Sequence, residues 1–293
     1  MATAASLTAS ADDLDLALQA APHRIGQVAL IVRDIEAVSG FYRSVLGLQV
    51  VESGRGKIRL GAGGSVLLEL RHDPDARLHS RREAGLFHTA FLLPGREELG
   101  AWLAFAAREG VQLTGAADHL VSEAVYLTDP EGNGIEIYVD RPRAAWRRTG
   151  GMIEMTSDPL DLNDLMAAAR TRAWSAFPED GVIGHVHLQV GDIAAAEAFY
   201  GDVLGFDITC RYRGASFHGS GGYHHQLATN VWNSRGAAER AGRTTGLGEL
   251  ELVVHHEVLE TVRARTASGM REAAPPGLSV QDPWGTLITL RSG

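Results

Sequence analysis

Two pairs of histidines stand close together in the second half of the chain. His185 and His187 lie in the segment VIGHVHLQV, and His224 and His225 lie in GGYHHQLATNVW. Residues two apart in a strand point to the same face, so the first pair would share one surface. A lone histidine on a strand is usually a packing or surface residue, but four on strands of one small unit indicate a chemical site. Imidazole titrates near neutral pH and binds metals, so such a site would transfer protons or hold a metal ion.

The segment around the first pair has a counterpart near the start of the chain. Residues 25–48 (IGQVALIVRDIEAVSGFYRSVLGL) align without a gap with residues 183–206 (IGHVHLQVGDIAAAEAFYGDVLGF), which indicates an internal duplication. Each copy starts with the alternating pattern of a strand. It then shows helical spacing from an aspartate, Asp34 or Asp192, which we predict as the N-cap, to the glycine that ends the helix.

A second kind of unit follows each copy. Residues 85–93 (GLFHTAFLL) begin a strand, residues 95–110 have helical spacing, and AVYLTDPEGNGIEIYVD reads as two strands around a turn. Its counterpart consists of GLGELELVV, a helical stretch near 255–267 and SVQDPWGTLITLRS. We therefore predict an α+β fold of four modules, each with a strand, a helix and three more strands. Their predicted spans are 24–72, 85–141, 182–233 and 245–292.

Composition restricts the classes of protein to be considered. A net charge of −9 disfavours nucleic acid and anionic membrane surfaces as partners. No apolar run approaches the ~20 residues of a membrane span, and the first residues lack the basic start and apolar core of a signal peptide. The single cysteine, Cys210, excludes an internal disulfide. We expect a cytoplasmic protein with no nucleic-acid or membrane partner, and these features are compatible with a homo-oligomer.

Several motifs resemble those of the vicinal oxygen chelate superfamily of glyoxalases, bleomycin resistance proteins and extradiol dioxygenases. These are FYRSVLGL, FYGDVLGF, GLFHTAF and DPEGNGIEIY, and longer stretches are similar to two-domain bacterial catechol 2,3-dioxygenase-like proteins. The resemblance implies βαβββ modules that pair into two cup-shaped domains, each cup a curved sheet that can surround a divalent metal. The implied parts are a tail at 1–23, a first domain at 24–141, a linker at 142–181 and a second domain at 182–293.

The resemblance also implies where metal ligands would lie, because superfamily ligands come from the first and last strands of each module. The residues at those places are Gln27 and Glu69 in module one, His88 and Glu136 in module two, His185 and His225 in module three, and Glu249 and Thr289 in module four. Strand parity further predicts that His225 shares a face with Leu227.

Which candidates act together depends on which modules share a cup, and three pairings are open. Modules one and two would combine Gln27, Glu69, His88 and Glu136, a set that resembles glyoxalase I. Modules three and four would combine the candidates of those modules, although Thr289 is a poor ligand. The third pairing joins modules two and three across the long linker.

The third pairing would bring together His88, Glu136 and His185. Two imidazoles and one carboxylate form the facial triad that leaves open positions on Fe(II). We favour this pairing because it concentrates the good ligands in one cup, and we expect one metal per chain. Fe(II) is the expected metal, with Mn(II), Zn(II) and Ni(II) as alternatives.

This ligand set implies an extradiol dioxygenase that cleaves the ring of catechol or a substituted catechol with O2. The reaction needs an acid–base group, and His225 is our candidate, with His224 and His187 as substitutes. Tyr138, on the last strand of module two, could donate a second hydrogen bond, and His119 lies either in the same cup or at a turn. The alternative functions are a glyoxalase-type isomerase or lyase and a metal-free small-molecule binding or resistance protein.

Overall fold

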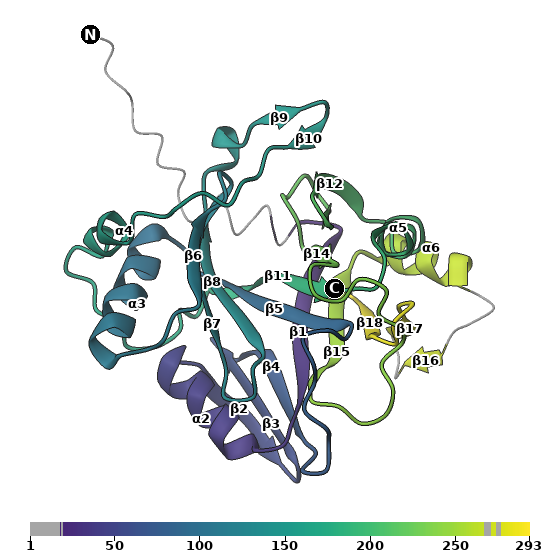
Figure 1. The fold of residues 1–293 in the computed structure, drawn as a ribbon, viewed down its shortest axis with the longest axis horizontal. Coiled ribbons are helices and arrows are strands. Elements are labelled where there is room, and N and C mark those ends of the chain that lie inside the picture. The colour runs from purple at the N-terminus through teal and green to yellow at the C-terminus, as the bar shows by residue number, and fades with distance from the viewer. Residues whose placement is uncertain (1–17, 19, 267–270, 274–276) are drawn as a thin grey trace.

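The computed structural model describes residue 18 and residues 20–266, 271–273 and 277–293, which form an α+β fold of βαβββ modules (Figure 1). Module one consists of β1 (His23–Val32), α2 (Ile35–Val45), β2 (Gln49–Gly54), β3 (Lys57–Ala62) and β4 (Ser65–His72). Module two consists of β5 (Gly85–Leu92), α3 (Arg96–Glu109), β6 (Gly115–Asp118), β7 (Ser122–Thr128) and β8 (Gly134–Asp140).

The second half repeats this order, as the internal duplication predicts. Module three consists of β11 (Val182–Gln189), α5 (Ile193–Glu197) with the π-helical turn η2 (Ala198–Val203), β12 (Asp207–Tyr212), β13 (Ala215–Gly219) and β14 (Leu227–Asn230). Module four consists of β15 (Gly246–Val254), α6 (His256–Thr266), β16 (Arg271–Ala273), β17 (Gly277–Gln281) and β18 (Leu287–Ser292). The side chains of Asp34 and Asp192 each accept a hydrogen bond from the backbone N–H three residues later in the chain. This confirms both predicted N-caps.

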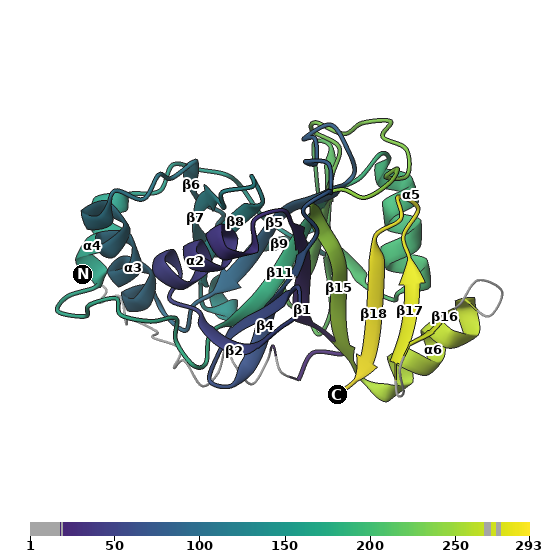
Figure 2. The same cartoon turned by 90° about the horizontal axis from the view of Figure 1, so that it is seen from below.

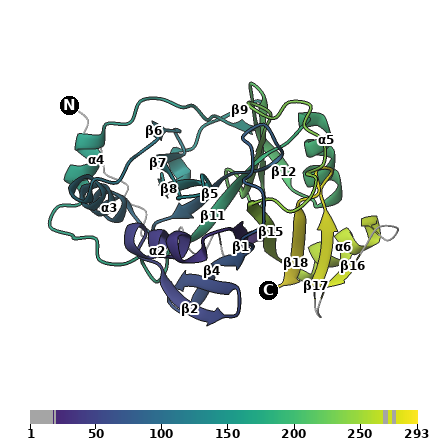
Figure 3. The ribbon, with the colours of Figure 1, turned by 60° about the horizontal axis from the view of Figure 1, so that its bottom comes forward.

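The segment between modules two and three contains η1 (Arg143–Ala145), β9 (Arg148–Thr149), β10 (Met152–Ile153) and α4 (Leu162–Ala168). Helix α4 packs closely on α3 at Gly100, where an added Cβ would lie 2.3 Å from the carbonyl oxygen of Leu165. Helices α3 and α4 lie side by side at one end of the molecule, whereas α5 and α6 lie at the other (Figure 3). Within the described residues, no helix combines the length and apolar character that crossing a membrane requires.

The strands form two eight-stranded sheets, and each sheet takes modules from both halves of the chain. One sheet has the order β16-β17-β18-β15-β1-β4-β3-β2, with β1 antiparallel to β15, so it joins modules one and four (Figure 2). The other has the order β12-β13-β14-β11-β5-β8-β7-β6, with β5 antiparallel to β11, so it joins modules two and three. The module pairing that we favoured from the sequence is therefore the pairing in the structure.

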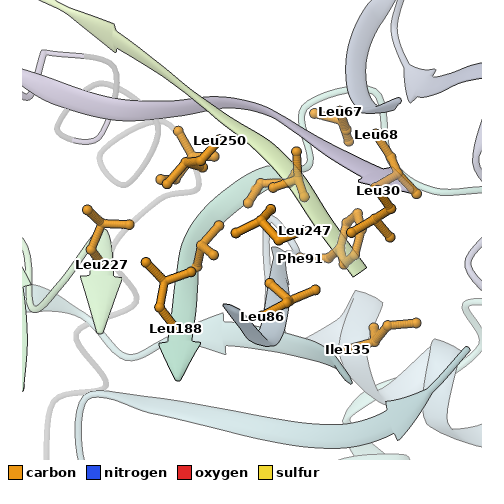
Figure 4. Close-up of a cluster of buried hydrophobic side chains, with 14 of the residues drawn as sticks. Leu30, Leu67, Leu68, Leu86, Phe91, Ile135, Leu188, Leu227, Leu247 and Leu250 are labelled. Carbon is orange, nitrogen blue, oxygen red and sulfur yellow. The ribbon is translucent and has the colours of Figure 1, made fainter. Parts of the chain in front are cut away.

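The hydrophobic core lies where the apolar faces of the two sheets meet. Figure 4 shows Leu30, Leu247 and Leu250 of one sheet against Phe91 and Leu188 of the other. Burial of one such side chain stabilises the fold by about 1.5–3 kcal/mol. Because side chains alternate along a strand, the residues between these core positions on β5 and β11 face the opposite side of their sheet.

Two hydrogen bonds of the same kind tie modules that are neighbours in sequence but lie in different sheets. The hydroxyl of Tyr42 donates to Asp129 at 3.5 Å, and the hydroxyl of Tyr200 donates to Asp282 at 2.9 Å. Each aspartate also accepts backbone N–H groups of its own Asp-Pro turn. The repeated Phe-Tyr and Asp-Pro motifs therefore have a structural role, since they join module one to two and module three to four.

An ion-pair network covers part of the sheet of modules one and four. The buried carboxylate of Glu69 contacts Lys57 at 3.2 Å, Arg59 at 2.7 Å and Arg71 at 2.6 Å. Burial alone would raise the pKa of Glu69, but the hydrogen bonds from these three cations outweigh it and lower the pKa to about 2. Arg71 also contacts Glu249 at 2.6 Å, so the network reaches across β1 to module four.

We expect Glu69→Gln to lower the free energy of unfolding by about 3 kcal/mol at pH 7. This is the free energy that corresponds to the lowered pKa of the Glu69 carboxyl. The folded pKa lies below the ordinary value of 4.5, so this stabilisation is complete above pH 4.5 and is lost as the pH falls toward 2. Urea unfolding at pH 7 and pH 3 measures the difference. Glu52→Gln, which removes an exposed partner of Arg59, is the control and should change stability little. An equal loss for Glu69→Gln at both pH values would contradict the expectation.

Candidate metal centre and cavity

Three side chains of the sheet of modules two and three converge on one point. Glu136 on β8 pairs with Ala90 on β5, and Ala90 pairs with His185 on β11, so these residues form one row across three strands. His88 lies two residues before Ala90 and therefore shares its face. The register of three strands thus brings His88, Glu136 and His185 together.

The distances show how closely these groups approach. Nε2 of His88 lies 2.9 Å and Nε2 of His185 lies 3.2 Å from the same carboxylate oxygen of Glu136. One ligand atom from each residue lies within 4.8 Å of the others, and all three side chains are buried. Nε2 of His88 has no hydrogen-bond partner of acceptable geometry despite its burial. A divalent cation between the three atoms would satisfy this nitrogen, so the donor set fits a metal ion.

The protonation states also suit a metal. Burial lowers the pKa of His185 to about 4. Burial would raise the pKa of Glu136, but the neighbouring His185 and His88 outweigh it and hold the pKa well below its usual range. Near neutral pH His185 is therefore neutral and Glu136 is ionised, the states in which these groups bind metals.

His187 lies one pleat from His185 on the same face, as the sequence predicts. It pairs with His88 across the sheet, and the two ring centroids are 5.0 Å apart. Its Nε2 lies 3.0 Å from the amide nitrogen of Asn230, which donates to it. His187 lines the cavity beside the three convergent residues, and burial lowers its pKa well below the usual range.

The side chain of His225 faces the cavity. The prediction from strand parity that His225 and Leu227 share a face is wrong. Strand β14 begins only at Leu227, whose side chain points into the core between the sheets (Figure 4). His225 precedes the strand, so the alternation of β14 does not set its direction. Its ring centroid lies 4.3 Å from that of His185 and 4.9 Å from that of Phe217. Burial lowers the pKa of His225 well below the usual range.

His224 and Tyr138 lie behind the cavity wall. His224 is fully buried, with Nδ1 2.8 Å from Nδ1 of His225 and Nε2 2.8 Å from Asp140. The hydroxyl of Tyr138 lies 2.9 Å from that of Tyr223, and its ring packs on His185 with centroids 4.8 Å apart. Neither residue lines the cavity, so the structure places both as supports of neighbouring residues and not as direct contacts of a substrate.

Tyr126, which no sequence pattern marked as a candidate, is one of two tyrosines that line the cavity, the other being Tyr212. It pairs with Glu136 in the β7–β8 hairpin, and its hydroxyl lies 2.6 Å from Nε2 of His119. Nδ1 of His119 lies 2.5 Å from the carbonyl oxygen of Thr156, so Nδ1 donates and neutral Nε2 accepts from Tyr126. Tyr126 and Glu136 lie at equal distances in sequence from Glu131, the centre of the hairpin, so they pair across it. This spacing is a sequence signal that could have identified Tyr126.

The cavity has a volume of about 420 Å³ and is lined on one side by the convergent histidines and Glu136. Aromatic residues form much of the adjoining wall, among them Phe87, Phe217 and Trp232. Phe87 occupies a β-bulge, because β5 has one extra residue between the pairs His187–His88 and Leu188–Leu86. A bulge re-aims a side chain, and here both Phe87 and His88 line the cavity. Met155, Thr156 and Ser157 of the segment between modules two and three also line the cavity.

The remaining candidates lie on the sheet of modules one and four. Gln27 donates to Glu251 at 3.5 Å, and Glu249 accepts from Thr289 at 2.6 Å. The glyoxalase-like set is therefore divided, with Gln27 and Glu69 on one sheet and His88 and Glu136 on the other. Among the residues that the structure describes, one group of three His, Cys, Asp or Glu side chains meets the distances of a metal site.

Comparison with known proteins gives a family match over both halves of the chain. The model of the Glyoxalase/Bleomycin resistance protein/Dioxygenase superfamily matches residues 24–137 and 182–290. A Bacillus subtilis (strain 168) protein named catechol-2,3-dioxygenase is 42% identical over 267 residues, which cover 88% of this chain and 93% of that protein.

Two solved structures share the fold at low sequence identity. A putative dioxygenase from Bacillus subtilis has a TM-score of 0.62 at 13% identity, covering 92% of this chain and 84% of that one. Glyoxalase I from Zea mays has a TM-score of 0.57 at 15% identity, covering 95% of both chains. At these identities the likeness concerns the fold, because this architecture carries more than one activity.

Proposed function

Because the chain belongs to the glyoxalase/bleomycin resistance/dioxygenase superfamily, we propose that it is an Fe(II)-dependent extradiol dioxygenase acting on a catechol. The observation that carries this proposal is the convergence of His88, Glu136 and His185 in a cavity with an aromatic wall. Two imidazoles and one carboxylate are typical of non-haem Fe(II) oxygenases, and they leave positions open for substrate and O2. The name of the 42% identical relative supports the same reaction.

His88, Glu136 and His185 would hold the metal. When bound, it would supply the Lewis acidity that lowers the pKa of a catechol hydroxyl and the redox chemistry with O2. The protein would supply the shape of the cavity, the orientation of the ring and the proton transfer. A flat diol fits beside the aromatic wall, since aromatic rings pack favourably edge to face or offset.

We assign proton transfer to His225. Its ring lines the cavity next to His185, and burial keeps it neutral, so one ring nitrogen carries a lone pair that can accept a proton from a catechol hydroxyl. His187 is less suited, because Asn230 already donates to its Nε2. In this assignment His225 takes the proton as the diol binds and returns it to the product.

Tyr126 would place the diol relative to the metal ligands. It lies beside Glu136 in the hairpin, and its hydroxyl oxygen can accept a hydrogen bond while its proton is held by His119. Burial, with the charge of Glu136 adding to it, raises the pKa of the Tyr126 hydroxyl well above its usual range. Tyr126 therefore stays protonated at neutral pH and acts by hydrogen bonding, not as a base.

The proposal is tested by metal analysis together with oxygen uptake. Protein purified without oxygen should contain close to one equivalent of iron, because one group of ligands converges. On addition of catechol it should consume one O2 for each yellow ring-opened product. Zinc-loaded protein is the control and should take up no oxygen, since Zn²⁺ has no redox chemistry. Two equivalents of metal would contradict the single site, and isomerase activity without oxygen uptake would favour the glyoxalase-type alternative.

A further inference from the structure

We propose that Asp140 and His224 are positioning residues that hold His225 in the tautomer with hydrogen on Nδ1, so that the lone pair of Nε2 faces the cavity. The catalytic consequence rests on the proposed function, in which His225 transfers the proton. The tautomer itself rests only on the hydrogen bonds behind the cavity wall, and neither residue contacts the cavity. The two claims can therefore be tested separately.

The chain of hydrogen bonds starts at a carboxylate that can only accept. One oxygen of Asp140 accepts from the hydroxyl of Tyr223 at 2.8 Å. The other lies 2.8 Å from Nε2 of His224, so this nitrogen must carry a hydrogen and donate. Because Tyr223 donates to Asp140, its oxygen accepts from the hydroxyl of Tyr138 at 2.9 Å. One buried carboxylate thus sets the direction of each hydrogen bond around it.

The same reasoning extends to His225. A neutral imidazole that carries its hydrogen on Nε2 has a lone pair on Nδ1. Nδ1 of His224 lies 2.8 Å from Nδ1 of His225, so with His224 in its neutral form His225 places its own hydrogen on Nδ1 to make this bond. Nε2 of His225 is then left unprotonated, and it is the nitrogen available to a substrate in the cavity. The opposite tautomer would set two lone pairs against each other at this distance.

The location of these groups supports a positioning role. Glu136, Tyr138 and Asp140 alternate along β8 and share one face, so the strand that carries a candidate metal ligand also carries the anchor of the chain. His224 has no exposed surface, and Asp140 is 7% exposed. Their contacts are therefore shielded from competing water, which strengthens the hydrogen bonds between them.

Nitrogen NMR tests the tautomer without any turnover. In protein with ¹⁵N-labelled histidine, loaded with diamagnetic Zn²⁺, the spectrum of His225 should show a protonated Nδ1 and an unprotonated Nε2. Comparison with His225→Ala assigns the signals. In His224→Phe the acceptor is gone, and a signal from protonated Nε2 of His225 should appear. A protonated Nε2 in the unaltered protein would overturn the inference.

Kinetics then test whether the two residues act through His225. His224→Phe should lower kcat by about 10²-fold with little change in KM, approaching the loss of a general acid–base group. The double variant His224→Phe/His225→Ala should be no slower than His225→Ala alone, because positioning has no value without the base. His224→Asn, whose side-chain oxygen can stand near the place of Nδ1, should restore part of the rate. Additive losses would show a separate structural role and would overturn the inference.

A control variant and a second outcome separate this inference from the proposed function. His218→Phe removes another buried histidine of module three, one that bonds to Thr229 and does not line the cavity, and it should leave kcat nearly unchanged. If His225→Ala were fully active while NMR showed the expected tautomer of His225, the assignment of proton transfer to His225 would be refuted. The inference that Asp140 and His224 set its tautomer would be supported. If His224→Phe did not fold, the unaltered protein and His224→Asn would still decide the tautomer.

Discussion

Replacement of His185 by alanine should abolish iron binding and ring cleavage together. His185 supplies one of the two imidazoles that approach the same oxygen of Glu136, and its removal leaves one imidazole and one carboxylate. We expect iron affinity to fall by more than the ~10–100-fold seen when only the hydrogen-bond partner of a ligand is lost. His88→Ala and Glu136→Ala should give the same joint loss. Iron content and oxygen uptake with catechol, measured on the same preparation, check this.

Gln27→Ala is the matched control for these variants. Gln27 is a ligand candidate of the glyoxalase-like set, but it lies on the sheet of modules one and four and donates to Glu251. We expect its replacement to leave iron content and activity nearly unchanged. An active, iron-loaded His185→Ala protein would refute the proposed site, and loss of metal in Gln27→Ala would point to the other sheet.

The second large effect concerns proton transfer. His225→Ala should keep its iron and lower kcat by about 10²–10⁴-fold, the range expected when a general acid–base group is lost. KM should change less, because the metal ligands and the aromatic wall remain. Steady-state kinetics with catechol, combined with iron analysis, measure both quantities.

His187→Gln is the informative comparison for His225→Ala. Glutamine can keep the hydrogen bond with Asn230, so we expect a smaller loss of kcat than for His225→Ala. A larger loss in His187→Gln would transfer the acid–base role to His187. Loss of iron in His225→Ala would show that His225 is a fourth ligand and not the proton carrier.

Most of the fold was predictable because the chain repeats itself. The ungapped duplication identified the modules, and the aspartates that cap α2 and α5 lie where helical spacing begins. The pairing of β5 with β11 was predictable only through chemistry, since it gathers two imidazoles and a carboxylate in one cup. Local sequence could not show it, because strand pairing between distant modules leaves no mark on the pattern of either strand.

The repeat and the family resemblance proposed His88, Glu136 and His185 from their places on the first and last strands of modules, and these three side chains converge in the structure. Strand alternation alone did less well for the residues around them. His225 lies just before β14, outside the regular alternation, and parity misplaced it. Phe87 turns into the cavity through a bulge, which alternation cannot predict. The direction of a side chain next to a strand end or a bulge depends on packing, so sequence spacing does not determine it.

Each sheet combines one module from the first half of the chain with one from the second half, and this arrangement affects how the chain folds. The pairing of β1 with β15 brings His23 next to Val254. The pairing of β5 with β11 joins strands that are separated in the sequence by the segment that contains α4. Both central contacts are remote in sequence, so the entropy of closing long loops must be met before either sheet is complete. The first half made alone would expose β1 and β5 as open edges, and the second half alone would expose β11 and β15, each with unpaired backbone groups. We therefore expect slow folding with aggregation-prone intermediates, and recovery only when both halves are present.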